Sequence, residues 1–298
     1  MKDSLTSKRS LLTTMKSKGT IIGKLVVTLV AYLGLRALMA WIRSLGGLFA
    51  RWGSEIGLGA DVAKGAGSLC VMLLTVALIV LFAYATGYRS RDLGLGTRGA
   101  LRRYFEGVAI SVAMIGAIVL LGLATGGVRF EGFGRGELGA VEFVALMLLA
   151  MLNVREELLF RGWMLADMRS YLPVGVAIVA SSVLFGVGHL SNPHVTTLAI
   201  VNLTLLGIFW ALCFVRTGSL WLLMAMHSFW NFIQSYVVGL PMSGMASSRS
   251  LLHLRGVDRG VFATDSFGLE GSLSMTVVVG VAIVVVLLIG GRRERQRR

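Results

Sequence analysis

Long apolar blocks fill most of the chain, and short polar or basic segments separate them. A bilayer core of about 30 Å is crossed by about 20 apolar helical residues. By that measure the pattern predicts eight membrane-spanning helices, at 21–42, 67–87, 104–125, 139–160, 174–190, 195–215, 219–238 and 273–290. The expected fold class is therefore an all-α integral membrane protein.

Composition supports this fold class. Of the 298 residues, 55% are hydrophobic and only 15% are charged, and the chain has three prolines. Ordinary globular domains have about 25% charged residues. These values exclude a disordered chain, a disulfide scaffold and most soluble enzymes. Cys70 and Cys213 lie far apart within apolar runs, so we interpret them as packing residues.

The net charge of +14 comes from Lys and Arg residues in the short segments before, between and after the apolar runs. This placement is typical of membrane topology signals. With both termini in the cytoplasm, the inside segments of the predicted topology hold 19 Lys and Arg residues and the outside segments hold eight. The first apolar run lacks a small-residue cleavage site, so it is read as a retained span. No basic stripe is interleaved with aromatic residues, and we therefore expect no nucleic acid partner.

Two adjacent acids end the fourth predicted span. Glu157 and Arg161 are four residues apart and can form a structural ion pair on a helix. Glu156 points about 100° away, so that pair leaves its carboxylate available. The alternative is that both acids merely cap the end of a span.

Three further polar residues lie on later spans: His189, His227 and Asn231. Each could instead be a structural residue that bonds within or between helices. At 1.5 Å per residue, His227 and Asn231 lie about 12 and 18 Å from the cytoplasmic side, and His189 about 22 Å. Glu156 reaches this level if its helix continues to about Ser170. The sequence then predicts one shared site within reach of the cytoplasmic side.

This set of groups suits hydrolysis of an amide bond. A carboxylate in a low-dielectric site can act as general base, and histidine and asparagine can stabilise an oxyanion. Alternatively, His189 and His227 could be zinc ligands, although no HExxH motif is present. The third ligand would then be Glu156, which would remove the general base, or Asn231, a poor zinc ligand. We therefore expect no certain cofactor, and zinc is not favoured.

The order of these motifs resembles a known family, the CPBP or Abi family of intramembrane endopeptidases, which includes the type II CAAX prenyl proteases. The motifs are Glu156-Glu157-x-x-x-Arg161, Phe185-x-x-x-His189 and His227-x-x-x-Asn231. The resemblance covers about 139–245. It implies an eight-helix core with the active site in a membrane-embedded cavity. It also implies Glu156 as water-activating base, with His189, His227 and Asn231 as stabilising groups and Glu157 beside them. Many family members are named metalloproteases.

The predicted spans, with the range of the resemblance, give a domain plan, and the resemblance implies partners. Residues 1–138 would form an N-terminal region with three spans, 139–245 the catalytic helices, and 246–298 an external loop, the last span and a basic cytoplasmic tail. The expected substrate is a membrane-associated, prenylated or bacteriocin-type peptide, which reaches the site from the cytoplasm or the lipid of a bacterial cell membrane. The alternatives are a non-proteolytic scaffold or immunity protein that keeps these motifs, and a transporter, for which no inverted repeat is seen.

Overall fold

The computed structural model describes residues 20–57, 60–136, 139, 154–246, 248–258, 260–264 and 266–295. The first helix begins where the Thr20 hydroxyl accepts a hydrogen bond from the Gly23 backbone N–H at 3.2 Å, a helix N-cap. The helices in the described part of the N-terminal region are α2 (Ile21–Ser44), α3 (Gly46–Glu55), α4 (Ala60–Ala85) and α5 (Ala100–Ala124).

The fourth predicted span is described only from residue 154, and 140–153 lie outside the described residues. Its visible part is a continuous helical segment made of α7 (Arg155–Glu157), the π-helical η1 (Leu158–Met164) and α8 (Leu165–Arg169). Pro173 then precedes α9 (Val174–Val187). The helix that bears Glu156 thus reaches Arg169, as convergence of the polar groups requires.

Three apolar helices complete the bundle. Gly218 ends α10 (Thr197–Thr217) with φ of 61°, a left-handed conformation that favours glycine. The chain then turns directly into α11 (Leu220–Phe232) and the π-helical η2 (Ile233–Val237). After a long connection and the 3₁₀ turn η3 (Leu269–Gly271), the chain ends its described part in α12 (Leu273–Arg295).

Several of these helices have the length and apolar character of membrane spans. Among the described residues, four are long and apolar enough to cross a bilayer: 21–55, 65–85, 100–124 and 197–217. Shorter apolar helices cover 174–187 and 273–289. Large apolar side chains point outward, with Ile22 74% exposed and Leu81 69% exposed. Such surfaces suit contact with lipid, and the chain is a membrane protein.

The expectation of an all-α fold is wrong in one place. Strand β1 (Val128–Arg135) pairs antiparallel with β2 (Ser250–Gly256), and the register shifts between Phe130 and Gly132. Both strands lie in segments interpreted as loops between spans. Strands of eight and seven residues are too short to form apolar blocks that cross a membrane, and their pairing joins residues far apart in sequence.

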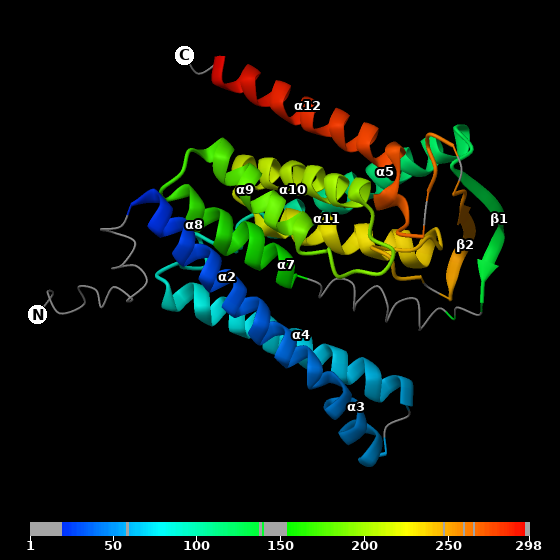
Figure 1. Ribbon diagram of the computed structural model, residues 1–298, viewed down its shortest axis with the longest axis horizontal. Coiled ribbons are helices and arrows are strands. Elements are labelled where there is room, and N and C mark those ends of the chain that lie inside the picture. The colour runs from blue at the N-terminus through cyan, green and yellow to red at the C-terminus, as the bar shows by residue number, and fades with distance from the viewer. Residues whose placement is uncertain are drawn as a thin grey trace, which may run out of the picture.

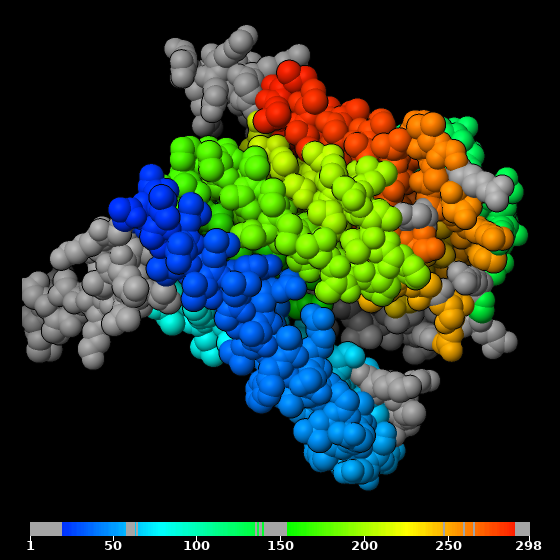
Figure 2. Space-filling model, in the orientation of Figure 1, coloured from blue at the N-terminus to red at the C-terminus, as the bar shows by residue number. Residues whose placement is uncertain are grey.

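The helices form a bundle with two distinct ends (Figure 1). At the basic end, the loop 86–99 meets residues 165–173 and the α10–α11 turn; for example, the Leu220 N–H donates to the Gly94 carbonyl at 2.9 Å. The sheet end holds β1 and β2, the loop 188–196 and the segment 239–272. In Figure 2 the segments around β1 and β2 form one end of the molecule, and α2 and α3 project along its side.

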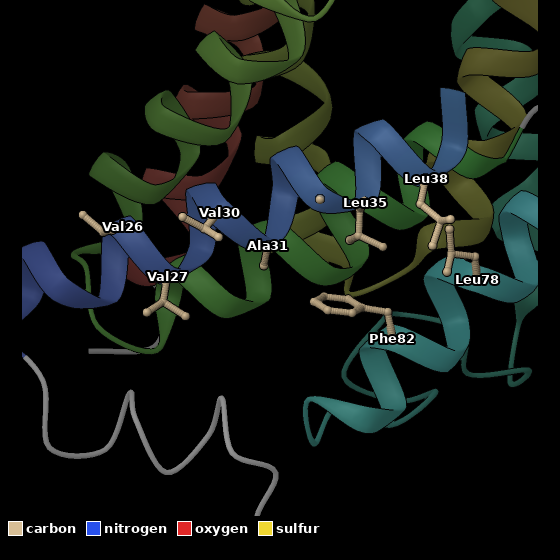
Figure 3. A pocket seen from close by; sticks show the side chains of 9 residues that line it. Val26, Val27, Val30, Ala31, Leu35, Leu38, Leu78 and Phe82 are labelled. Carbon is tan, nitrogen blue, oxygen red and sulfur yellow. The ribbon is translucent and has the colours of Figure 1, made fainter. Parts of the chain in front are cut away.

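Helices α2 and α4 pack loosely against each other and leave an apolar groove of about 540 Å³. It is lined by aliphatic side chains of α2 and by Leu78 and Phe82 of α4. Figure 3 shows Leu38 of α2 next to Leu78, with Phe82 below α2 farther along the groove. All nine lining residues are apolar, so this groove carries no group for chemistry.

Candidate active site

A buried charged pair lies at the centre of the bundle. The Arg161 guanidinium donates to Glu157 through Nη1 at 3.1 Å, and the two side chains are 1% and 0% exposed. The ion pair that the four-residue spacing predicts is therefore present. The guanidinium also lies over the Phe185 ring, 4.3 Å from its centre. Glu157 does not line the cavity described below; it lies behind the groups that do.

Glu157 also holds the first histidine of the third motif. The Nδ1 atom of His227 lies 2.8 Å from Glu157 Oε1. Because a carboxylate accepts, the Nδ1–H group donates the hydrogen bond. The imidazole packs on Trp210 with ring centres 4.6 Å apart. These contacts fix the ring plane, and they leave Nε2 as the nitrogen free for the cavity. Glu157 thus links Arg161 to His227 across two helices.

Glu156 and His189 form a second, more open pair. The Glu156 Oε2 and His189 Nε2 atoms are 4.0 Å apart, and their side chains are 24% and 15% exposed. His189 Nδ1 lies 2.9 Å from the Phe185 carbonyl oxygen. A carbonyl oxygen can only accept, so Nδ1 carries the proton and Nε2 faces Glu156. As expected from the sequence, the ion pair with Arg161 leaves Glu156 available.

A cavity of about 620 Å³ brings the predicted residues together. Glu156, His189, His227 and Asn231 all line it, from α7, the turn after α9, and α11. The π-helical η1 follows Glu157 directly, and such widened turns are frequent at functional sites. The structure therefore assembles four of the five expected catalytic side chains around one space, and keeps the fifth, Glu157, in a supporting position.

Close helix packing beside His189 depends on two glycines. A Cβ at Gly186 would collide with the Thr204 hydroxyl of α10. A Cβ at Gly188 would lie 2.9 Å from Arg36 Nη1. Arg36 donates from both terminal nitrogens to the Gly188 carbonyl at 3.3 Å. This contact anchors the turn that carries His189 to α2.

Glu270 is a site residue that the sequence interpretation missed. It is 2% exposed and lines the cavity. One carboxylate oxygen accepts from the Ser243 backbone N–H at 2.8 Å and from the Ser243 hydroxyl at 2.6 Å, and the other accepts from Trp230 Nε1 at 3.2 Å. Asn192 donates to the Ser243 carbonyl at 3.2 Å. In the sequence, the signal for Glu270 was its position as an acid three residues before the last apolar run, 273–290.

Asp167 is a second buried acid outside the expected set. It is 3% exposed, and it accepts from Thr28 of α2 at 2.7 Å and from the Tyr88 hydroxyl at 3.0 Å. These bonds tie α2 and the loop 86–99 to α8 at the basic end. Its sequence signal was a lone acid among the apolar residues 163–168.

The donor set does not fit a zinc site. Among the described residues, no group of three or more His, Cys, Asp or Glu side chains is placed to hold a metal ion. His227 Nδ1 and Glu157 bond to each other, and His189 Nδ1 bonds to a carbonyl oxygen. Ligation through the two remaining Nε2 atoms would need Glu156 as third ligand, and Glu156 would then no longer be available as the base. The other described carboxylate that lines the cavity, Glu270, accepts hydrogen bonds on both oxygens.

One comparison with known proteins identifies the central part of the chain. Residues 137–233 match the family model described as type II CAAX prenyl endopeptidase Rce1-like. This region contains all three motifs, and its residues 137–138 and 140–153 lie outside the described part of the structure. The chain matches neither a curated protein nor a solved structure. The central third of the chain is therefore similar to the Rce1-like type II CAAX prenyl endopeptidases.

Proposed function

We propose that this protein is an intramembrane endopeptidase that hydrolyses a peptide bond in membrane-associated peptides, with Glu156 activating the water. The observation that carries the proposal is the cavity in which Glu156, His189, His227 and Asn231 meet. The Rce1-like domain at 137–233 supports peptide hydrolysis as the reaction class. Prenylated and bacteriocin-type peptides are the proposed substrate classes.

The separation of Glu156 and His189 suits one water molecule. Both Glu156 Oε2 and His189 Nε2 are acceptors, and they are 4.0 Å apart. A water about 2.8 Å from each would donate one hydrogen to each at an angle of about 90°, close to its own bond angle. Its lone pair then points away from both acceptors, toward a substrate carbonyl.

The reaction follows from this arrangement. Glu156 takes a proton from the water as the oxygen attacks the carbonyl carbon, and the carbonyl oxygen becomes an oxyanion. The Asn231 amide donates to this oxyanion, as does Nε2 of His227 in its protonated form, which the Glu157 carboxylate stabilises. Glu156 then gives the proton to the leaving amine as the C–N bond breaks, which restores the carboxylate.

The proposed topology has eight spans with both termini in the cytoplasm. Four long and two short apolar helices support it, together with the continuous segments 155–169 and 220–237. The pairing of β1 with β2 also supports it, because both strands come from segments predicted on the same, outer side. Two residues counted as cytoplasmic in the sequence do not lie in a loop: Arg155 lines the cavity and Arg161 is buried beside Glu157. Without them the inside count falls from 19 to 17, against eight outside.

Glu156→Gln tests the mechanism. The amide is nearly isosteric with the carboxylate but cannot take the proton of the water, so we expect loss of peptide hydrolysis with normal membrane abundance. Peptides that accumulate in membranes of cells with Glu156→Gln, but not with the wild type, would identify substrates. Unchanged hydrolysis in a folded Glu156→Gln variant would contradict the mechanism and favour a scaffold.

A further inference from the structure

The cavity belongs to one end of the bundle. Helix α2 lines it only from Arg36 onward, and α4 only with Ser68 and Val71, near its beginning. Helix α9 contributes Phe185 at its end, and the loop after it contributes His189. Since these helices run in opposite directions, each one supplies the half that lies toward the sheet end. No described residue of the basic end lines the cavity.

The cavity also reaches the surface at the sheet end. Five of its lining residues are exposed: Ala40, Arg43, Ser68, Ser191 and Met245. All five lie in the sheet-end half of their helix or in the loops 188–196 and 239–272. The lining residues nearest the bundle centre, including Phe160, Phe185 and Trp210, are buried. The cavity therefore has its mouth at the sheet end and its floor in the bundle.

Packed layers separate that floor from the basic end. The buried Glu157–Arg161 pair lies behind the cavity, followed along the helix by Trp163, which is 1% exposed. Beyond it, Asp167 binds Thr28 and the Tyr88 hydroxyl. These contacts seal α8 against α2 and the loop 86–99.

The distribution of charge orients the two ends. The segment 88–103 at the basic end carries five arginines, and Arg169 and Arg216 lie at the same end. With the predicted basic segments before the first span and after the last, this side holds 17 Lys and Arg residues, against eight in 43–66, 126–138 and 239–272. Short loops rich in Lys and Arg remain in the cytoplasm. The sheet end then faces outward.

We infer that the cavity opens on the extracytoplasmic side of the membrane, and that its substrates are peptides presented at the outer face. The position of the mouth is independent of catalysis, whereas the identity of the substrates rests on the proposed function. This route differs from the cytoplasmic access expected from helix depth alone. Helix depth gives the distance of each residue from the basic end, but it does not reveal the packed layers that close this end.

Cysteine accessibility tests the inference in the full-length membrane protein. Ser191→Cys and Met245→Cys each place a thiol at the mouth, and Thr97→Cys places an exposed control thiol at the basic end. All three are made in a Cys70→Ala background; the remaining Cys213 is buried, and labelling of the parent is subtracted. A membrane-impermeant sulfonated maleimide is applied to spheroplasts and to inside-out vesicles.

We expect both mouth thiols to react in spheroplasts and the Thr97→Cys thiol to react only in inside-out vesicles. Reaction of the mouth thiols from the vesicle side alone, or from neither side, would overturn the inference. A reporter peptide added outside spheroplasts should be cleaved by the wild type and not by Glu156→Gln. Outward labelling without any cleavage would refute the proposed hydrolysis but not the position of the mouth.

Discussion

The His227 imidazole and the Glu157 carboxylate are joined by a 2.8 Å hydrogen bond, although 70 positions separate them in the chain. The same oxygen of Glu157 accepts from Arg161 at 3.1 Å. One carboxylate therefore compensates a buried cation and orients an imidazole that lines the cavity. In this way the second glutamate of the motif links the stability of the bundle to the geometry of the site.

Glu157→Gln should destabilise the protein strongly, because it leaves the Arg161 guanidinium buried without a counter-charge. Loss of one partner of a buried pair costs about 3–5 kcal/mol. Thermal unfolding of detergent-solubilised protein measures the effect. The double variant Glu157→Gln/Arg161→Met removes both charges and should recover part of the loss. Equal destabilisation of the single and double variants would refute the pair as a stabilising unit.

Much of the site could be predicted from the spacing of residues along single helices. The four-residue step from Glu157 to Arg161 predicts their contact, and Pro173 marks where the next helix begins. The apolar blocks predict the helix on which His227 lies, and the helix α9 that ends at Val187, two residues before His189. The rise per residue along each helix then predicts similar depths in the membrane for these two histidines.

The remainder depends on contacts that local periodicity does not encode. The π-helical turn at 158–164 keeps an ordinary apolar helix pattern, so its sequence does not reveal the widened turn. The β1–β2 register joins Val128 to Gly256, and no local alternation specifies that partner. Glu270 enters the site through a long connection, so its bond to Trp230 has no signal in spacing.

Chelation should leave the activity of the purified enzyme unchanged, and elemental analysis should find well under one zinc per chain. The reason is the use of the donor atoms: His227 Nδ1 binds Glu157 and His189 Nδ1 binds a backbone carbonyl. Zinc sites favour three good protein ligands. Among the described residues that line the cavity, Glu156 is the one carboxylate whose oxygens are not both used, because those of Glu270 accept from Ser243 and Trp230. Stoichiometric zinc that disappears in both His189→Ala and His227→Ala would contradict this prediction.

Gly188→Ala should lower the turnover of the enzyme. The new methyl carbon would lie 2.9 Å from Arg36 Nη1 and 3.1 Å from the Phe185 carbonyl oxygen, which accepts from His189. Arg36 must then move, and the orientation of His189 is disturbed. Gly175→Ala, near the start of the helix that Gly188 caps, is the matched control, because its added carbon meets nothing within 4 Å. The control should keep full turnover and gain up to about 0.5–1 kcal/mol in stability.

If Gly188→Ala and Gly175→Ala retain the same kcat, the contact of Arg36 with the His189 turn has no role in catalysis. Comparison with Arg36→Met completes the test. That variant removes the same hydrogen bonds without adding volume at the turn, so it should lower kcat in the same direction.

Glu270→Gln should reduce both stability and peptide hydrolysis. The carboxylate accepts from Ser243 on one oxygen and from Trp230 Nε1 on the other. A glutamine turns an N–H₂ group toward one of these donors, and a buried unsatisfied donor costs about 1–3 kcal/mol. Hydrolysis should fall as well, because Ser243 lines the cavity and Trp230 directly precedes Asn231 in the chain.

Glu106→Gln makes the same chemical change at a partly exposed ion pair with Arg102 and Arg103, and is the matched control. Such pairs contribute about 0–1 kcal/mol, so this variant should unfold and hydrolyse nearly as the wild type does. Glu270→Asp keeps the charge and both acceptors on a shorter side chain, and should recover part of the kcat/KM that Glu270→Gln loses. A Glu270→Gln enzyme with unchanged kcat/KM would show that the Ser243 turn does not shape the catalytic cavity.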